Sequence, residues 1–168
     1  PAIQMAGGYI FNAGVINGNV DLGYSAFGGV GFGLGMFVSA GGQLNGSLRF
    51  GSGSDLFLDR GDGTFVTGTI DGGAGIDIFG HSRSSDATVT LGAIPALNFE
   101  SELVEARGES TTVTTAGTTS GNNTLYLVGT GHIVNTVSTA GAISAFAPFT
   151  VNGEVLEPGL ARLTNTGD

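Results

Sequence analysis

The amino-acid sequence predicts an all-β chain wound as a parallel β-helix, and three observations lead to this fold class. The composition disfavours helices, because 32 of the 168 residues are Gly and the chain is also rich in Thr, Ser and Val. Several stretches alternate apolar and polar residues with a period of two, which is typical of a strand with one buried face. One motif also occurs twice at a fixed spacing, and such a period indicates a repeat architecture.

The repeated motif lies between residues 46 and 79. Both copies place a Gly, an aliphatic residue, two further Gly, an Asp and a Phe at the same offsets, 22 residues apart (68 − 46). The shared positions are Gly46, Leu48, Gly51, Gly53, Asp55 and Phe57 in the first copy, and Gly68, Ile70, Gly73, Gly75, Asp77 and Phe79 in the second. A partial copy over residues 18–23 opens the same way but lacks the Gly-x-Asp-x-Phe ending.

A step of 22 residues can hold one coil of three strands. Three strands of four or five residues, joined by short turns, need roughly 20 residues. Identical offsets then place equivalent residues above one another in coils spaced about 4.8 Å apart. We therefore expect Leu48 to pair with Ile70, the Phe and Asp of the two copies to stack likewise, and about seven coils in all.

The remaining segments are typical of short strands between turns. Residues 9–23 carry turn signals around a stretch, 16–22, that alternates apolar and polar residues. Gly alternates with apolar residues over 29–35, which fits either a strand with one bare face or a flexible loop. A turn over 59–63 joins the two full copies. Further strands are expected at 88–91, within 97–106, at 111–115 and at 124–128, and no helix longer than two turns.

Residues 1–168 are expected to form one β-helix segment, because no linker or shift in composition marks a domain boundary. Residues 163–168 look like the opening of another coil, which favours an internal fragment of a longer chain. The ends of such a rod are exposed parallel edges, so further coils or edge-to-edge self-association are expected there. An antiparallel β-sandwich stays open as the alternative fold, although it leaves the repeated offsets unexplained.

Charge and cysteine content argue against several functions. The chain has 14 acidic residues against five basic ones, a formal net charge of −9 and no Cys. Without a basic patch, no nucleic-acid partner is expected. Without Cys, disulfides and thiolate metal sites are excluded.

Carboxylates at Glu100, Glu102 and Glu105 form the main acidic cluster. Paired carboxylates can serve as acid and base in glycoside hydrolysis. The alternation places Glu100 and Glu102 on one face of a strand, and we expect that face to be solvated, with no catalytic role.

Other candidates for catalysis are weaker. A β-helix enzyme acting on polysaccharides would need Arg and acids converging on one face, and Asp59, Arg60 and Asp62 are the only candidates and share a single turn. His81 and His132 have no nucleophile or base at a recognisable spacing, and both are expected in exposed turns. We predict a protein that is not an enzyme, and keep a polysaccharide-acting β-helix enzyme as an alternative.

The stretch from Asn12 to Gly23, Asn-Ala-Gly-Val-Ile-Asn-Gly-Asn-Val-Asp-Leu-Gly, resembles the coil sequence of bacterial autotransporter passenger domains, as do the two Gly-rich copies and Asn98-Phe99-Glu100. The resemblance covers most of residues 9–105. It implies a right-handed, single-stranded parallel β-helix, secreted through a C-terminal outer-membrane barrel and serving as a structural or adhesive stalk on the surface of a Gram-negative bacterium. Its implied partners are further coils, the barrel and a host or matrix surface ligand.

A second resemblance concerns calcium. Residues 72–80 fit the nine-residue calcium repeat of repeats-in-toxin proteins at every position, and residues 50–58 fit except at the first Gly. In that family glycines let carbonyl groups and the Asp converge on calcium. The resemblance implies a calcium-binding secreted module, with Asp55 and Asp77 as ligands. Those repeats run in tandem every nine residues, however, whereas these two lie 22 apart (77 − 55).

The stacking of Asp55 on Asp77 raises an electrostatic question. Two carboxylates about 5 Å apart repel by roughly 1 kcal/mol even in water. Three arrangements could relieve this repulsion: outward splaying into water, a bound calcium ion, or backbone N–H groups from the turns at Gly51, Gly53, Gly73 and Gly75. We favour the backbone N–H groups and no cofactor, because the tandem calcium spacing is missing.

Overall fold

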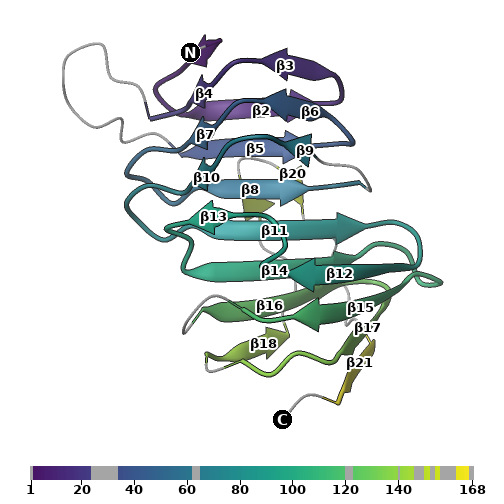
Figure 1. The fold of residues 1–168 in the computed structure, drawn as a ribbon. Coiled ribbons are helices and arrows are strands. Elements are labelled where there is room, and N and C mark those ends of the chain that lie inside the picture. The colour runs from purple at the N-terminus through teal and green to yellow at the C-terminus, as the bar shows by residue number, and fades with distance from the viewer. Residues whose placement is uncertain are drawn as a thin grey trace. The chain divides into compact units, whose positions relative to one another are not determined.

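The computed structural model describes residues 2–23, 34–61, 65–119, 123–139, 141–145, 150–151, 154–155 and 162–166. Within these residues every regular element is a strand, and the strands form stacked coils of a β-solenoid with about five turns, about 23 residues apart (Figure 1). The predicted parallel β-helix is confirmed, and the antiparallel sandwich is not formed. None of the described residues forms a helix with the length and hydropathy of a membrane span.

The chain divides into two compact units, and we describe each by itself. The first unit comprises Pro1–Phe79 and Pro95–Phe99, and the second comprises Gly80–Ile94 and Glu100–Asp168. Strand β11 (Ile78–Arg83) begins in the first unit and ends in the second.

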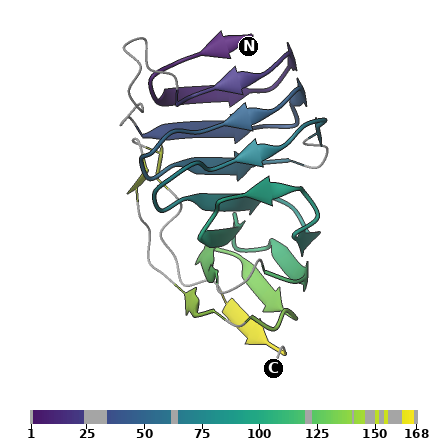
Figure 2. The ribbon, with the colours of Figure 1, turned by 60° about the vertical axis from the view of Figure 1, so that its left-hand side comes forward.

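The first unit has coils of three strands. The strands are β1 (Ile3–Gln4), β2 (Gly8–Asn12), β3 (Val15–Asn17), β4 (Val20–Asp21), β5 (Gly35–Ser39), β6 (Gln43–Asn45), β7 (Leu48–Arg49), β8 (Leu56–Asp59), β9 (Phe65–Val66), β10 (Ile70–Asp71) and β13 (Ala96–Leu97). They pair in parallel as β1-β4-β7-β10-β13, as β2-β5-β8 and as β3-β6-β9, and the figures show the coils stacked one on another (Figures 1 and 2). Each coil thus contributes one strand to each of three sheets, as the 22-residue step predicts.

The predicted register of the repeat is confirmed. Leu48 pairs with Ile70, and Val20 of the partial copy pairs with Leu48. Coil length nevertheless varies: Leu48 follows Val20 by 28 residues (48 − 20), whereas Phe57 follows Phe37 by 20 (57 − 37). Strands keep their register while the turns absorb the difference in length, because only the paired residues are constrained by the ladder. The part of the chain that the structure describes forms about five turns, whereas a uniform step over all 168 residues would give about seven.

The interior of the first unit contains a column of phenylalanines. The rings of Phe37 and Phe57 stack with centroids 5.9 Å apart, and those of Phe57 and Phe79 are 4.8 Å apart. Phe99 meets Phe79 edge to face at 5.4 Å and Phe50 in the same way at 6.3 Å. Ring pairs at these separations are favourable beyond the apolar area that they bury. The predicted stacking of Phe57 on Phe79 is therefore confirmed.

The second unit has a different pattern of sheets. Its strands are β12 (Ala87–Leu91), β14 (Ser101–Ala106), β15 (Thr112–Gly117), β16 (Thr124–Gly129), β17 (His132–Asn135), β18 (Ile143–Ala145), β19 (Thr150–Val151), β20 (Glu154–Val155) and β21 (Arg162–Asn165). Parallel ladders join β14-β16-β18 and β12-β15-β17-β21, while β19 and β20 form a small antiparallel pair. Its core is aliphatic, with Val104, Val113, Leu125, Leu127 and Ile133 all buried.

Predicted strand positions agree with the structure except at three places. The alternating stretch 16–22 is divided between β3 and β4, because the chain turns at Gly18, which has a φ of 110°. The stretch 97–106 is divided between β13 and β14, because Asn98 adopts a φ of 57° and interrupts the extended chain. Of the glycine-alternating stretch 29–35, residues 29–33 lie outside the described residues, and Gly35 begins β5. Every residue of β5 is buried, so this strand is covered on both faces.

Candidate functional site

Asp55 and Asp77 occupy equivalent corners of successive coils, directly before β8 and β11. Asp77 accepts the backbone N–H of Asp55 through Oδ1 at 2.8 Å. Asp55 in turn accepts the N–H of Gly35 through Oδ1 at 2.5 Å and the N–H of Gly51 through Oδ2 at 3.2 Å. Each carboxylate therefore bonds to the backbone of the preceding coil at the equivalent position.

The burial of the two carboxylates excludes one of the three arrangements considered for this corner, outward splaying into water, and the hydrogen bonds support another, backbone N–H donors. Asp55 is 2% exposed and Asp77 is fully buried, so outward splaying is wrong. Backbone N–H donors are present as favoured, although Gly35 and Asp55 itself serve where Gly53, Gly73 and Gly75 were expected. Burial raises the pKa of the Asp55 carboxyl, and the hydrogen bonds from Gly35 and Gly51 oppose this rise.

Calcium at this corner stays a prediction. The described residues contain no group of three or more His, Cys, Asp or Glu side chains placed to hold a metal ion. Calcium takes six to eight oxygen ligands. Both oxygens of Asp55 and Oδ1 of Asp77 already accept backbone N–H groups, so a calcium ion would have to compete with these bonds.

The repeated glycines form stacks beside this corner. A Cβ added to Gly46 would lie 2.6 Å from the carbonyl of Gly18, and one added to Gly68 would lie 2.8 Å from that of Gly46. A Cβ on Gly73 would overlap the carbonyl oxygen of Gly51, and Gly73 also has a φ of +96°. Gly75 meets Gly53 in the same way. These positions require Gly because the neighbouring backbone occupies the space of a side chain.

The outer face of the sheet β1-β4-β7-β10-β13, here called the short-strand face, carries polar side chains in register. Asp21 pairs with Arg49, and Arg49 pairs with Asp71, so the arginine lies between two aspartates of neighbouring coils. Oδ1 of Asp21 accepts the N–H of Gly23 at 3.0 Å, and Oδ1 of Asp71 accepts that of Gly73 at 3.1 Å. The aspartates thus close the turns that follow their strands.

Arg49 itself stands where an aspartate stands in the coils on either side. Its side chain is exposed, and it makes no hydrogen bond or ion pair with any described residue. Two hollows, one of about 320 Å³ and one of about 270 Å³, both have Arg49 and Asp71 in their walls. The larger is lined by Gln4, Asn19, Val20, Asp21, Ser47, Leu48, Arg49, Thr69 and Asp71. The smaller is lined by Gly23, Arg49, Gly51, Ser52, Asp71, Gly73, Ala74 and Asn98.

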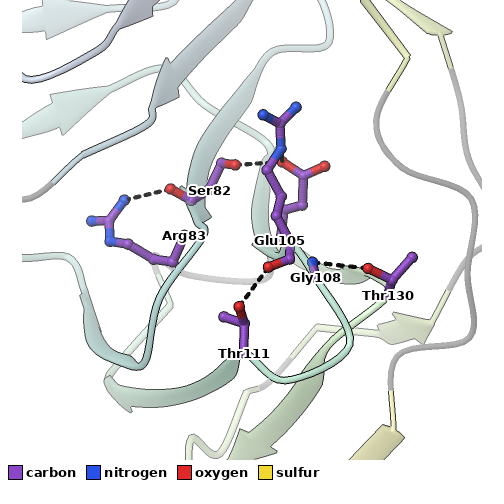
Figure 3. Close-up of polar contacts among 7 residues, drawn as sticks. Ser82, Arg83, Glu105, Gly108, Thr111 and Thr130 are labelled. Carbon is purple, nitrogen blue, oxygen red and sulfur yellow. Dashed lines mark hydrogen bonds and ion pairs between the residues drawn. The ribbon is translucent and has the colours of Figure 1, made fainter.

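The second unit contains a buried polar cluster around Glu105. Oε2 of Glu105 accepts the hydroxyl of Ser82 at 2.5 Å and Nε of Arg107 at 3.1 Å (Figure 3). Glu105 is fully buried, whereas the Arg107 side chain is 31% exposed. The carbonyl oxygen of Arg107 accepts the hydroxyl of Thr111 at 2.5 Å, which holds the following turn. A charge buried in this way is tolerated because it is paired and hydrogen-bonded.

The expectation of a solvated face carrying Glu100 and Glu102 is therefore wrong for Glu102, and the third acid of the cluster, Glu105, is also buried. Glu100 is exposed, but Glu102 is 5% exposed and Glu105 is fully buried. Every residue of β14 is buried, so the alternation in its sequence does not separate a wet face from a dry one. Period-two patterns locate the two faces of a strand, whereas the packing around the strand decides which faces meet water.

Most of the remaining candidates lie in strands or beyond the described residues, and Arg60 directly follows β8. His81 is 5% exposed within β11, and His132 lies in β17 with Nε2 3.0 Å from the hydroxyl of Thr164, so the expected exposed turns are wrong. Asp59 is buried in β8 and accepts the N–H of Gly61 at 3.2 Å. Asp62 lies outside the described residues.

One polar ladder was missed by the sequence analysis. Asn135 is fully buried in the second unit and accepts the hydroxyl of Thr115 at 2.5 Å through Oδ1. Its Nδ2 donates to the carbonyl of Val137 at 3.0 Å and to Oδ1 of Asn165 at 2.9 Å. The three ladder residues recur at steps of 20 (135 − 115) and 30 (165 − 135), so no fixed period reveals them.

Comparison of the chain with protein-family models, with curated proteins and with solved structures finds no match.

Proposed function

We propose that this chain is a non-catalytic scaffold, a β-solenoid stalk of an autotransporter-like surface protein that extends or presents other parts. The observation that carries the proposal is the use of corner carboxylates to bind the backbone of the preceding coil. Asp55 and Asp77 are the most buried acids of the first unit's repeat, and their oxygens bond to backbone N–H groups. Carboxylates bonded in this way stabilise the stacking of one coil on the next.

The surface location rests on the resemblance of residues 9–105 to autotransporter passenger domains, and it remains part of the proposal. A solenoid suits a stalk because each coil contacts only its neighbours, so length can change without redesign of a common core. Such a rod can be lengthened or shortened by whole coils.

The test is an in-register deletion in the full-length protein. Because Leu48 pairs with Ile70 and Arg49 pairs with Asp71, removal of residues 49–70 joins Leu48 to Asp71 and excises one coil. We expect a folded, cooperatively unfolding protein that still reaches the cell surface, detected by antibody on intact cells. The matched control, a deletion of residues 49–59, breaks the register and should not fold. Equal behaviour of the two deletions contradicts the scaffold proposal.

A polysaccharide-acting enzyme is the second candidate, and one observation favours it. Asp21 and Asp71 lie two coils apart on one face, on either side of Arg49, so the strand spacing places their backbones roughly 9.6 Å apart, near the upper limit for such a pair of carboxyl groups. Inverting glycosidases place their carboxyl groups about 6.5–9.5 Å apart. Release of reducing ends from a polysaccharide by the wild-type protein, lost in Asp21→Asn and Asp71→Asn, would favour the enzyme over the stalk.

A further inference from the structure

We propose that the larger hollow on the short-strand face binds a neutral, extended polysaccharide that crosses successive coils. This inference deepens the proposed function, because it rests on the stalk being a surface scaffold and names the ligand class that its side would hold. The hollow has a volume of about 320 Å³, which lies at the lower end of the range for ligand sites. It therefore suits a short stretch of a longer chain.

Arg49 supplies the first part of the argument. Arginine in proteins presents several N–H donors in a rigid, planar fork. Here the fork is exposed and makes no hydrogen bond or ion pair with any described residue, although aspartates lie in register on both sides. Vicinal hydroxyl groups of a sugar can accept from such a fork and donate to a neighbouring carboxylate. The order Asp21, Arg49, Asp71 offers this pairing twice.

The charge balance of the hollow argues for a neutral ligand. Two carboxylates and one guanidinium leave a net negative charge, which disfavours phosphate, sulfate and acidic sugars. The positive guanidinium between the carboxylates would repel a metal ion, so a bound cation is also disfavoured. An apolar ligand would leave the polar groups of the wall without partners, which is costly. A polyhydroxylated, uncharged molecule can satisfy donors and acceptors together.

A second ladder supplies further donors beside Arg49. Oδ1 of Asn19 accepts the N–H of Ser47 at 3.0 Å, and the hydroxyl oxygen of Ser47 accepts the N–H of Thr69 at 3.2 Å. These bonds use the acceptor sides of Asn19 and Ser47, so the amide N–H groups and the hydroxyl hydrogen can face a ligand. The ladder repeats at the coil spacing of about 4.8 Å. A polymer lying along the stack would meet similar groups at each coil.

The experiment uses the full chain and four neutral hexasaccharides as probes: cellohexaose, maltohexaose, mannohexaose and chitohexaose. Binding is measured by saturation-transfer NMR and by calorimetry, with heparin as an acidic probe. We expect saturable binding of at least one hexasaccharide and none of heparin. Arg49→Ala should lower the affinity about tenfold or more, since bonds to charged groups are the stronger ones.

Two further variants separate binding from folding. Asp71→Asn keeps an oxygen for the N–H of Gly73 and for Nδ2 of Asn98 and removes only the charge, so it should weaken binding without altering the melting temperature. Arg162→Ala, at an exposed arginine of β21, is the matched control and should bind as the wild type does. The proposal is overturned if no hexasaccharide binds, if heparin binds instead, or if Arg49→Ala and Arg162→Ala bind equally. In each of these cases the coil-deletion variant can still fold and reach the cell surface, so the binding proposal can fail while the scaffold proposal stands.

Discussion

The two units wind the same kind of parallel coil but fill and fasten it differently. The first unit stacks phenylalanines in its interior and fastens its corners with Gly and Asp at equivalent positions. The second has an aliphatic core and fastens its coils through Glu105 and through the ladder of Thr115, Asn135 and Asn165. The comparison teaches that the coil requires a filled interior and satisfied corners, whereas the chemistry that provides them can change along one chain.

The largest expected effect concerns the aromatic column of the first unit. Phe57→Ala removes a fully buried ring that contacts Phe37 and Phe79, and it should lower the free energy of unfolding by about 3–5 kcal/mol. Urea denaturation measures the loss. Phe11→Ala is the matched control on the same sheet, because Phe11 is 52% exposed, and it should cost far less. Similar losses for the two variants would contradict the column as the core of this unit.

The glycine stack gives the next effect. Gly73→Ala places a Cβ against the carbonyl of Gly51 and at a φ of +96°, so we expect a loss of about 3 kcal/mol or more. Gly14→Ala meets no atom within 4 Å and should change stability by less than about 0.5 kcal/mol. The two substitutions are chemically identical, so a difference in melting temperature reports the close backbone contact and the positive φ of Gly73 together. Tolerance of alanine at Gly73 would argue against close backbone contact there.

The buried charge of the second unit provides a smaller effect. Glu105→Ala removes the acceptor of Ser82 and Arg107, and we expect a loss of about 2 kcal/mol. This figure lies below the range for a fully buried pair, because Arg107 can turn toward water. Glu109→Ala, at an exposed position of the same unit, should be nearly neutral by chemical denaturation. Comparable losses in the free energy of unfolding for the two variants would show that the hydrogen bonds of Glu105 do not stabilise this unit.

The smallest effect is a pH dependence at the corner of the first unit. Burial raises the pKa of Asp55 above its unfolded value. Between these two pKa values the folded protein binds more protons than the unfolded one, so the free energy of unfolding falls as the pH rises through this window. Asp55→Asn cannot titrate and keeps an oxygen for the Gly35 N–H, so this part of the fall should disappear from a series of melting temperatures. The exposed Asp86→Asn should retain it, and an unchanged slope in Asp55→Asn would refute the assignment.

The sequence alone was sufficient for the fold class, the register of the repeat and the position of most strands. Leu48 with Ile70 and Phe57 with Phe79 could be paired from the sequence because the two coils place identical or similar residues at identical offsets. Equal spacing then leaves one register in which all of them coincide. The contact of Asp55 with Asp77 followed from the same reasoning, although the donors did not.

Tertiary structure decided what is buried, and therefore which candidates can meet a ligand. Nothing in the alternation around Glu102 and Glu105, or in the Gly beside His81, distinguishes a solvated strand from one covered on both faces. The lengths of the other coils, which differ from the 22-residue repeat, were also decided by the tertiary structure, because turns can hold extra residues without changing the pairing of the strands. The offsets of the repeat already align Arg49 with Asp21 and Asp71, which lie 28 (49 − 21) and 22 (71 − 49) residues away, whereas the exposure of Arg49 and the hollow beside it were decided only in the tertiary structure. Residues this far apart are brought together by the winding of the chain, and local sequence patterns carry no record of such contacts unless the same residue recurs.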